Sequence, residues 1–128
     1  MTDYEVILKK AKEVSQNAYT PYSKFNVGAC VLCESGNTYT GCNFENASYG
    51  LTICAERNAI GSAVAAGERK IKAIAVYSPN QDNCFPCGAC RQEIYEFASP
   101  DGVDVITEHE SKIVIHSIDE LLPKGFSL

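Results

Sequence analysis

The sequence has no apolar run that approaches the roughly 18 consecutive residues needed to cross a bilayer. Its first residues, Met1 to Glu5, lack the basic stretch and apolar core of a secretory signal peptide. Positive charge is also scarce, because 11 lysines and arginines stand against 16 acidic residues and the formal net charge is -5. Affinity for nucleic acid comes largely from basic side chains that neutralise phosphates. We therefore expect a cytoplasmic protein with neither a membrane nor a nucleic-acid partner.

No internal repeat, linker or low-complexity tract divides the chain. With 128 residues and 45% hydrophobic composition, it can bury one core, so we expect one domain over residues 1–128. The expected elements are a helix over 3–17 opened by a capping box at 2–5, strands over 25–32 and 38–42 joined as a hairpin, a helix from 54 ending at 67, a strand over 71–77, a helix from 86 to about 97, strands over 103–107 and 113–116, and a short helix opened by a capping box at 117–120. This order predicts a three-layer α/β/α domain with a mixed five-stranded central sheet.

Seven cysteines form an odd number, which favours reduced thiols and a metal site over a disulfide framework. Three of them, Cys54, Cys87 and Cys90, lie at the predicted starts of two helices. The free N–H groups at a helix start favour thiolate over thiol. Because structural zinc sites are almost always closed by four ligands, three thiolates indicate a catalytic zinc site with one open position.

Charged side chains flank these cysteines. Glu56 lies two residues beyond Cys54 and can reach the open position as a proton carrier. Zinc with three thiolates has a formal charge of -1, which must be offset if a bound water is to ionise. Arg57 and Arg91 both stand beside ligand-bearing turns, and we favour Arg57 as the donor of charge-assisted hydrogen bonds to the sulfurs.

Five sequence blocks extend this pattern over nearly the whole chain. They are Pro21-Tyr22-Ser23-Lys24-Phe25-Asn26-Val27-Gly28-Ala29, Gly41-Cys42-Asn43-Phe44-Glu45-Asn46-Ala47, Cys54-Ala55-Glu56-Arg57, Pro86-Cys87-Gly88-Ala89-Cys90-Arg91-Gln92 and Glu120-Leu121-Leu122-Pro123. Together they resemble the small, homotetrameric, zinc-dependent cytidine deaminases. One departure is Asn58, which stands where the family usually has threonine.

The resemblance implies a fold like that of the cytidine deaminases and one zinc ion per subunit, bound by Cys54, Cys87 and Cys90. It implies that Glu56 takes a proton from water, delivers it to N3 of the pyrimidine and helps ammonia to leave. The expected reaction converts cytidine, and also 2′-deoxycytidine, to the uridine compounds in pyrimidine salvage.

The resemblance also implies how the substrate is held. Phe25 would pack against the base, and the backbone of Ala55 would hydrogen-bond its edge. Asn43 and Glu45 match the family's ribose-reading pair, which favours a nucleoside over a free base. The carboxylate of Glu45 also disfavours a nucleotide, because a 5′-phosphate would meet negative charge.

Small members of this family are homotetramers whose neighbours complete each active site. Tyr49 and Phe126 match positions that reach across to another subunit. The resemblance therefore implies a homotetramer with shared active sites.

Three alternatives remain open. Cys84 precedes Cys87 by three residues and could close a non-catalytic Cys₄ zinc module. A deaminase of a nucleoside-like antibiotic would share the zinc motif without needing Asn43 and Glu45, and a nucleic-acid editing deaminase would carry basic or stacking surfaces. The sequence assigns no function to Cys30, Cys33 and Cys42, and places His109 and His116 outside both metal segments.

Overall fold

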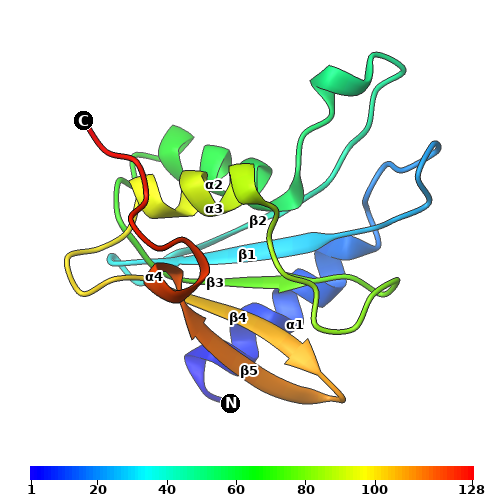
Figure 1. Ribbon diagram of the computed structural model, residues 1–128. Helices are drawn as coiled ribbons and strands as arrows, with labels where there is room; N and C mark the ends of the chain where they lie inside the picture. Colours follow the sequence, from blue (N-terminus) through cyan, green and yellow to red (C-terminus); the bar gives the residue numbers. More distant parts are fainter.

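A mixed five-stranded sheet forms the centre of the computed structural model, which describes residues 1–128 (Figure 1). The strand order is β2-β1-β3-β4-β5, in which β3 and β4 pair in parallel and the other neighbours pair antiparallel. The elements are α1 (Asp3–Ser15), β1 (Gly28–Cys33), β2 (Thr38–Cys42), a 3₁₀ turn (Tyr49–Leu51), α2 (Ala55–Ala65), β3 (Ile71–Tyr77), α3 (Gly88–Glu96), β4 (Asp104–His109), β5 (Lys112–Ser117) and α4 (Ile118–Leu121). The predicted order of helices and strands is confirmed.

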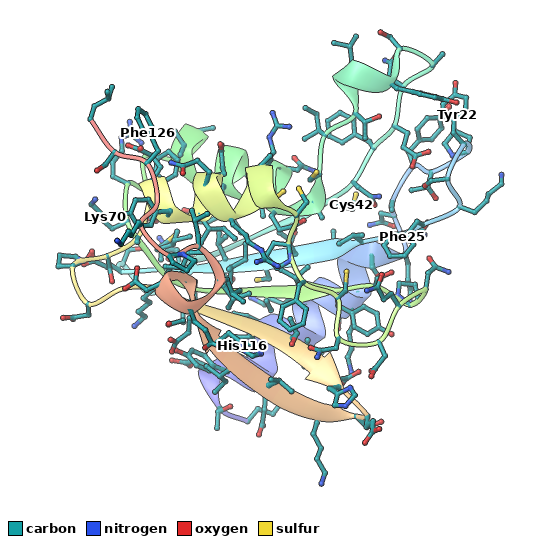
Figure 2. All side chains as sticks on the ribbon, viewed as in Figure 1. Tyr22, Phe25, Cys42, Lys70, His116 and Phe126 are labelled. Carbon is teal, nitrogen blue, oxygen red and sulfur yellow. The ribbon has the colours of Figure 1, made fainter.

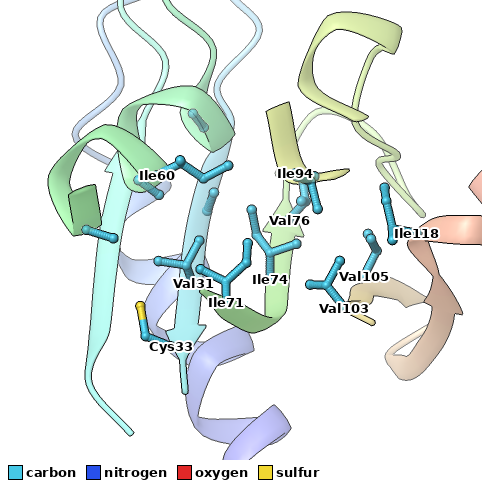
Figure 3. Packing of buried hydrophobic residues seen from close by; sticks show 14 of the residues in the cluster. Val31, Cys33, Ile60, Ile71, Ile74, Val76, Ile94, Val103, Val105 and Ile118 are labelled. Carbon is cyan, nitrogen blue, oxygen red and sulfur yellow. The ribbon is translucent and has the colours of Figure 1, made fainter. Parts of the chain in front are cut away.

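Helices cover both faces of the sheet, as predicted for a three-layer α/β/α fold (Figure 1). Successive residues of a strand point to opposite faces, and β1 is buried on both. Val31 shares the larger hydrophobic cluster with Ile60 of α2 and Ile94 of α3 (Figure 3). Leu32 lies in the second cluster, with Ile7 of α1. The strand is apolar at every position because each face packs against a helix.

A glycine lets α2 lie close to β2. A Cβ at Gly41 would come within 2.4 Å of the backbone nitrogen of Ala59 and 2.8 Å of the backbone oxygen of Ala55. Beside this contact, the amide Nδ2 of Asn58 donates to the backbone oxygen of Cys42 at 3.0 Å. This bond gives Asn58 a structural role: it ties the first turn of α2 to the end of β2.

Some predicted boundaries are wrong. The first strand was expected over 25–32 but begins at Gly28, because the backbone of residues 25–27 bonds mostly to side chains rather than to a neighbouring strand. The first helix ends at Ser15 rather than 17. Pro86 was expected in the first turn of a helix, but it precedes the N-cap, Cys87.

The last two strands are longer than their predicted ranges, 103–107 and 113–116. β4 begins at Asp104, and the two strands meet at a tight turn formed by Glu110 and Ser111, both with positive φ, as a two-residue hairpin connection requires.

The two predicted capping boxes have different outcomes. At the start of α1, the box of Thr2 and Glu5 is complete. At the start of α4, Ser117 Oγ accepts from the N–H of Glu120 at 3.2 Å, but the Glu120 carboxylate bonds to His116 Nδ1 at 2.8 Å instead of returning to the cap. Only half of the second box therefore forms.

None of the helices combines the length and apolar composition needed to cross a membrane.

Candidate active site

The starts of α2 and α3 bring three cysteines together. Cys54 is the N-cap of α2, Cys87 is the N-cap of α3, and Cys90 lies in the first turn of α3. Their Sγ atoms all lie within 4.8 Å of one another. A tetrahedral zinc ion with Zn–S bonds of about 2.3 Å needs sulfurs about 3.8 Å apart, a spacing that falls within this limit. The donor set of three thiol groups therefore fits zinc.

The neighbourhood of the cysteines favours a thiolate. A hydrogen bond from the Cys90 thiol, a second from Cys87 and the positive charge of Arg57 lower the pKa of Cys54 to about 6. The same hydrogen bond, which leaves the proton on Cys90, raises the pKa of Cys90. A site that already stabilises one thiolate is prepared to accept a cation.

The two arginines differ in what they contact. Arg57 is exposed and donates no hydrogen bond to a sulfur. It therefore acts on Cys54 through its charge rather than through the predicted hydrogen bonds. Arg91 donates from Nε to the backbone oxygen of Pro86 at 2.8 Å and from Nη1 to that of Leu121 at 2.9 Å. Arg91 thus ties the start of α3 to α4.

A cavity of about 220 Å³ lies beside the three cysteines. Its lining residues are Phe25, Val27, Asn43, Thr52, Cys54, Ala55, Glu56, Gln81, Cys84, Phe85 and Cys87. Three hollows of larger volume occur on the chain, but no cysteine lines any of them. The cavity is therefore the only one of these four hollows that is lined by cysteines.

The cavity includes residues that the sequence did not single out. Thr52, Gln81 and Phe85 all belong to irregular segments, two of them to the polar loop between β3 and α3. Phe85 directly precedes Pro86 and the cysteine motif, and this position weakly indicates a place near the metal site. Nothing in the sequence marks Thr52 or Gln81.

Glu56 forms part of the cavity wall and is only 4% exposed. Burial, together with the negative charge of Cys54, raises the pKa of Glu56 to about 7. A carboxyl group with such a pKa exchanges a proton readily near neutral pH, as a general acid and base must. Its place in the first turn of α2 keeps it next to Cys54.

Cys84 lines the cavity but does not join the metal-binding cluster. Burial and the nearby charge of Glu56 raise the pKa of Cys84 to about 11, so this thiol stays neutral. The side chains present thus form a three-cysteine set beside an open cavity, and the closed Cys₄ arrangement does not occur. Cys30 and Cys33 are buried in β1, where burial also raises the pKa of each thiol to about 11.

Asn43 lies in the cavity and braces the segment that carries Phe25. Its Oδ1 accepts from the backbone N–H of Val27 at 2.9 Å, and its Nδ2 donates to the backbone oxygen of Phe25 at 2.8 Å. One amide hydrogen and one oxygen lone pair remain for another partner. The residue can therefore brace the wall and contact a ligand at the same time.

Glu45 lies next to the cavity rather than in it. It lines an open hollow of about 400 Å³ with Tyr22, Ser23, Tyr49 and Thr52, and Thr52 also lines the cavity. The carboxylate accepts a hydrogen bond from the Ser23 hydroxyl and from the backbone N–H groups of Tyr22 and Ser23, which holds its pKa below the usual range. Thr52 thus lies between the two hollows and lines both.

Tyr49 and Phe126, the two aromatic residues predicted to reach another subunit, do not lie in the cavity. Tyr49 is 75% exposed and packs edge-on against Tyr22, with ring centroids 6.0 Å apart. Phe126 is 67% exposed, and Gln92 bonds to its backbone nitrogen and oxygen. Figure 2 shows Phe126 and Phe25 at opposite ends of the molecule. Neither aromatic lines the cavity of its own chain.

Comparison with known proteins identifies the family and the fold. The family model that describes the cytidine and deoxycytidylate deaminase zinc-binding region matches residues 1–105 of this sequence. The chain belongs to the cytidine and deoxycytidylate deaminase family. Within this family, the cytidine deaminase of Sporosarcina psychrophila is 43% identical over 125 residues, covering 98% of this chain and 92% of the relative. That of Mycoplasma genitalium is 42% identical over 124 residues, covering 95% and 94%.

The family's solved structures have the same architecture. The crystal structure of cytidine deaminase from Burkholderia pseudomallei matches with a TM-score of 0.89 and 42% identity, covering 98% of this chain and all of that one. The cytidine deaminase from Mycobacterium tuberculosis matches with a TM-score of 0.85 and 34% identity over the full length of both chains. The family resemblance and the predicted α/β fold with a mixed five-stranded sheet are therefore confirmed.

Proposed function

We propose that this chain is a zinc-dependent cytidine deaminase that hydrolyses cytidine, and also 2′-deoxycytidine, to the uridine compounds and ammonia. The observation that carries the proposal is the cluster of Cys54, Cys87 and Cys90 beside a cavity whose wall contains the buried carboxyl group of Glu56. The relatives at 43% and 42% identity are both named cytidine deaminase. Residues 1–128 would act as one catalytic domain.

The three cysteines would hold one zinc ion per subunit. Zinc, when bound, lowers the pKa of a coordinated water toward neutrality. The charge of Arg57 and the N-terminal ends of α2 and α3 lie where they offset the negative charge of the thiolates. These features support a site that tolerates three anionic ligands.

Glu56 would move the protons of the reaction. Water supplies the oxygen that bonds to C4 of the pyrimidine, and the bond from C4 to the amino nitrogen breaks. Of the two protons of that water, Glu56 would transfer one to N3 and one to the departing amino group, which leaves as ammonia. The position of this carboxyl group in the cavity wall, next to Cys54, supports the role.

The substrate would be held by both hollows. Phe25 and Ala55 line the cavity together with Glu56, and the ring of Phe25 and the backbone of Ala55 would contact the base. Asn43 in the cavity and Glu45 in the adjoining hollow would bond to the ribose hydroxyls. The position of the two hollows on either side of Thr52, which lines both, supports a ligand with two parts, a base and a sugar.

The protein would function as a cytoplasmic homotetramer in pyrimidine salvage. Tyr49 and Phe126 would each reach the active site of a neighbouring subunit. Their exposure, and their absence from the cavity of their own chain, support a role across an interface. The family's small members provide the precedent.

The proposal is tested by incubating the purified protein with cytidine and quantifying uridine and ammonia. A second sample is treated with a chelator, and a third is treated and then resupplied with zinc. We expect equal amounts of both products, loss of turnover with the chelator and recovery with zinc. A folded, zinc-loaded protein that leaves cytidine unchanged would overturn the proposal and move the assignment to an antibiotic deaminase.

A further inference from the structure

The aromatic wall of the cavity stands on a segment that belongs to no strand. Residues 25–27 precede β1, and both Phe25 and Val27 line the cavity. A segment without ladder hydrogen bonds must satisfy its backbone groups in another way. Here nearly all of these groups bond to side chains, so the position of the Phe25 ring depends on those side chains.

Asn43 holds this segment from one side through Phe25 and Val27. The backbone of Asn26, between them, is held from the other side by the loop after β3. The N–H of Asn26 donates to Asn80 Oδ1 at 2.9 Å, and the Ser78 hydroxyl donates to the backbone oxygen of Asn26 at 2.6 Å.

Ser78 also fixes Asn80, since the N–H of Asn80 donates to Ser78 Oγ at 3.1 Å. Ser78 is itself 4% exposed, at the end of β3. Asn80 is therefore anchored to the sheet even though its own side chain is exposed.

The same loop is fixed at its far end. The N–H of Asn83 donates to the backbone oxygen of Glu108 at 2.8 Å, and the buried Thr107 hydroxyl donates to Asn83 Oδ1 at 2.6 Å. Beyond this anchor come Cys84 and Phe85, which form another part of the cavity wall. One loop thus joins two walls of the cavity, and both of its ends are tied to the sheet.

We propose that Asn80 is a positioning residue that holds the Phe25 ring in place for the pyrimidine base through the backbone of Asn26. This inference rests on the proposed function and deepens it, because Asn80 belongs to none of the motifs that carry the family resemblance. Asn80 does not line the cavity. Its effect must therefore pass through the Phe25 wall and appear in substrate binding.

The test compares Asn80→Ala, Asn80→Asp and the wild-type enzyme. Alanine removes the acceptor for the N–H of Asn26, and we expect KM for cytidine to rise roughly 3- to 10-fold, as the loss of one hydrogen bond implies, with kcat and zinc content nearly unchanged. Aspartate keeps an acceptor oxygen at the same place, so we expect it to restore KM. The control is Asn17→Ala, because Asn17 is exposed and its side chain forms no hydrogen bond.

A double-mutant cycle separates positioning through Phe25 from any other effect. In a Phe25→Ala background, we expect Asn80→Ala to produce no further increase in KM, because the ring that it positions is gone. An equal increase in both backgrounds would overturn the proposal, as would an Asn80→Ala enzyme with unchanged KM. A general loss of stability would instead lower zinc content and kcat, and aspartate would not correct it.

Equilibrium binding of uridine to the zinc-loaded proteins gives a readout that does not depend on turnover. We expect the dissociation constant to rise in Asn80→Ala by the same factor as KM. If the wild-type protein neither binds uridine nor deaminates cytidine, the proposed function fails and the role of Asn80 fails with it. If the wild type does both and Asn80→Ala matches it, only the positioning role fails.

Discussion

A Cβ on Gly41 would lie 2.4 Å from the backbone nitrogen of Ala59. This contact between β2 and α2 allows the helix to lie directly on the strand. The helix begins at Ala55, directly after its N-cap Cys54, and carries Glu56 in its first turn. The distance between Gly41 and Ala59 therefore helps to set where a metal ligand and the candidate proton carrier lie.

Gly41→Ala should destabilise the protein by about 1–3 kcal/mol or more, because the close atoms are backbone and cannot move aside alone. Urea unfolding of the zinc-loaded protein measures this. Gly61→Ala is the matched control: this glycine lies in α2 with open space around its Cα, so alanine should raise stability by up to about 1 kcal/mol. Equal effects of both substitutions would contradict the close-approach argument.

Glu56→Gln should keep zinc but lower kcat by at least roughly 10²–10⁴-fold, because the amide fills the same space without carrying a proton. Metal analysis and steady-state assays check both parts. Glu13→Gln serves as the control, since Glu13 is exposed on α1 and forms no hydrogen bond through its side chain. A Glu56→Gln enzyme with near-normal turnover would remove this residue from the mechanism.

Cys84→Ser should retain both zinc and activity, since the Cys84 thiol stands outside the metal-binding cluster. Cys90→Ser should lose zinc, because it removes one of three ligands. Zinc content per chain, measured on both variants, distinguishes a three-cysteine site from a closed Cys₄ module. Loss of zinc from Cys84→Ser would favour the closed Cys₄ module instead.

Glu45→Ala should lower kcat/KM for cytidine by roughly 10- to 100-fold, the range expected when a charged hydrogen-bond acceptor for a sugar hydroxyl is lost. Turnover of free cytosine, which has no ribose, should change little. The measured quantity is the ratio of cytidine to cytosine turnover in the variant and in the wild type. An unchanged ratio would mean that Glu45 does not read the sugar.

Phe126→Ala should raise KM for cytidine without changing zinc content, if this exposed ring completes the site of a neighbouring subunit. Native mass spectrometry should show four chains and four zinc ions for the wild type. Tyr95→Phe is the control. Tyr95 lies on α3 beside Gly125, the residue before Phe126, and phenylalanine keeps the ring that Gly125 approaches. A monomeric and fully active wild type would contradict the shared-site arrangement.

Much of the fold was predictable because its signals are local. The Thr2 cap, the apolar run of β3 and the turn at Gly36 each lie within a few residues of the element that they specify. The cysteine motifs were equally local, and the structure brings Cys54, Cys87 and Cys90 together as their spacing implied. The predicted start of β1 was wrong because a hydrophobic pattern does not reveal whether a backbone group will bond to a neighbouring strand or to a side chain.

Local patterns in the chain were enough to predict the order of the helices and strands and the residue types available to bind a metal. The position of Cys84 in the cavity but outside the metal cluster, and the hydrogen bond between Asn80 and Asn26, 54 positions away, became visible only in the folded protein. Such relationships depend on how separate elements pack. Local propensity and spacing report only what neighbours in the chain do, so contacts between distant loops emerge only when the sheet and its helices have formed.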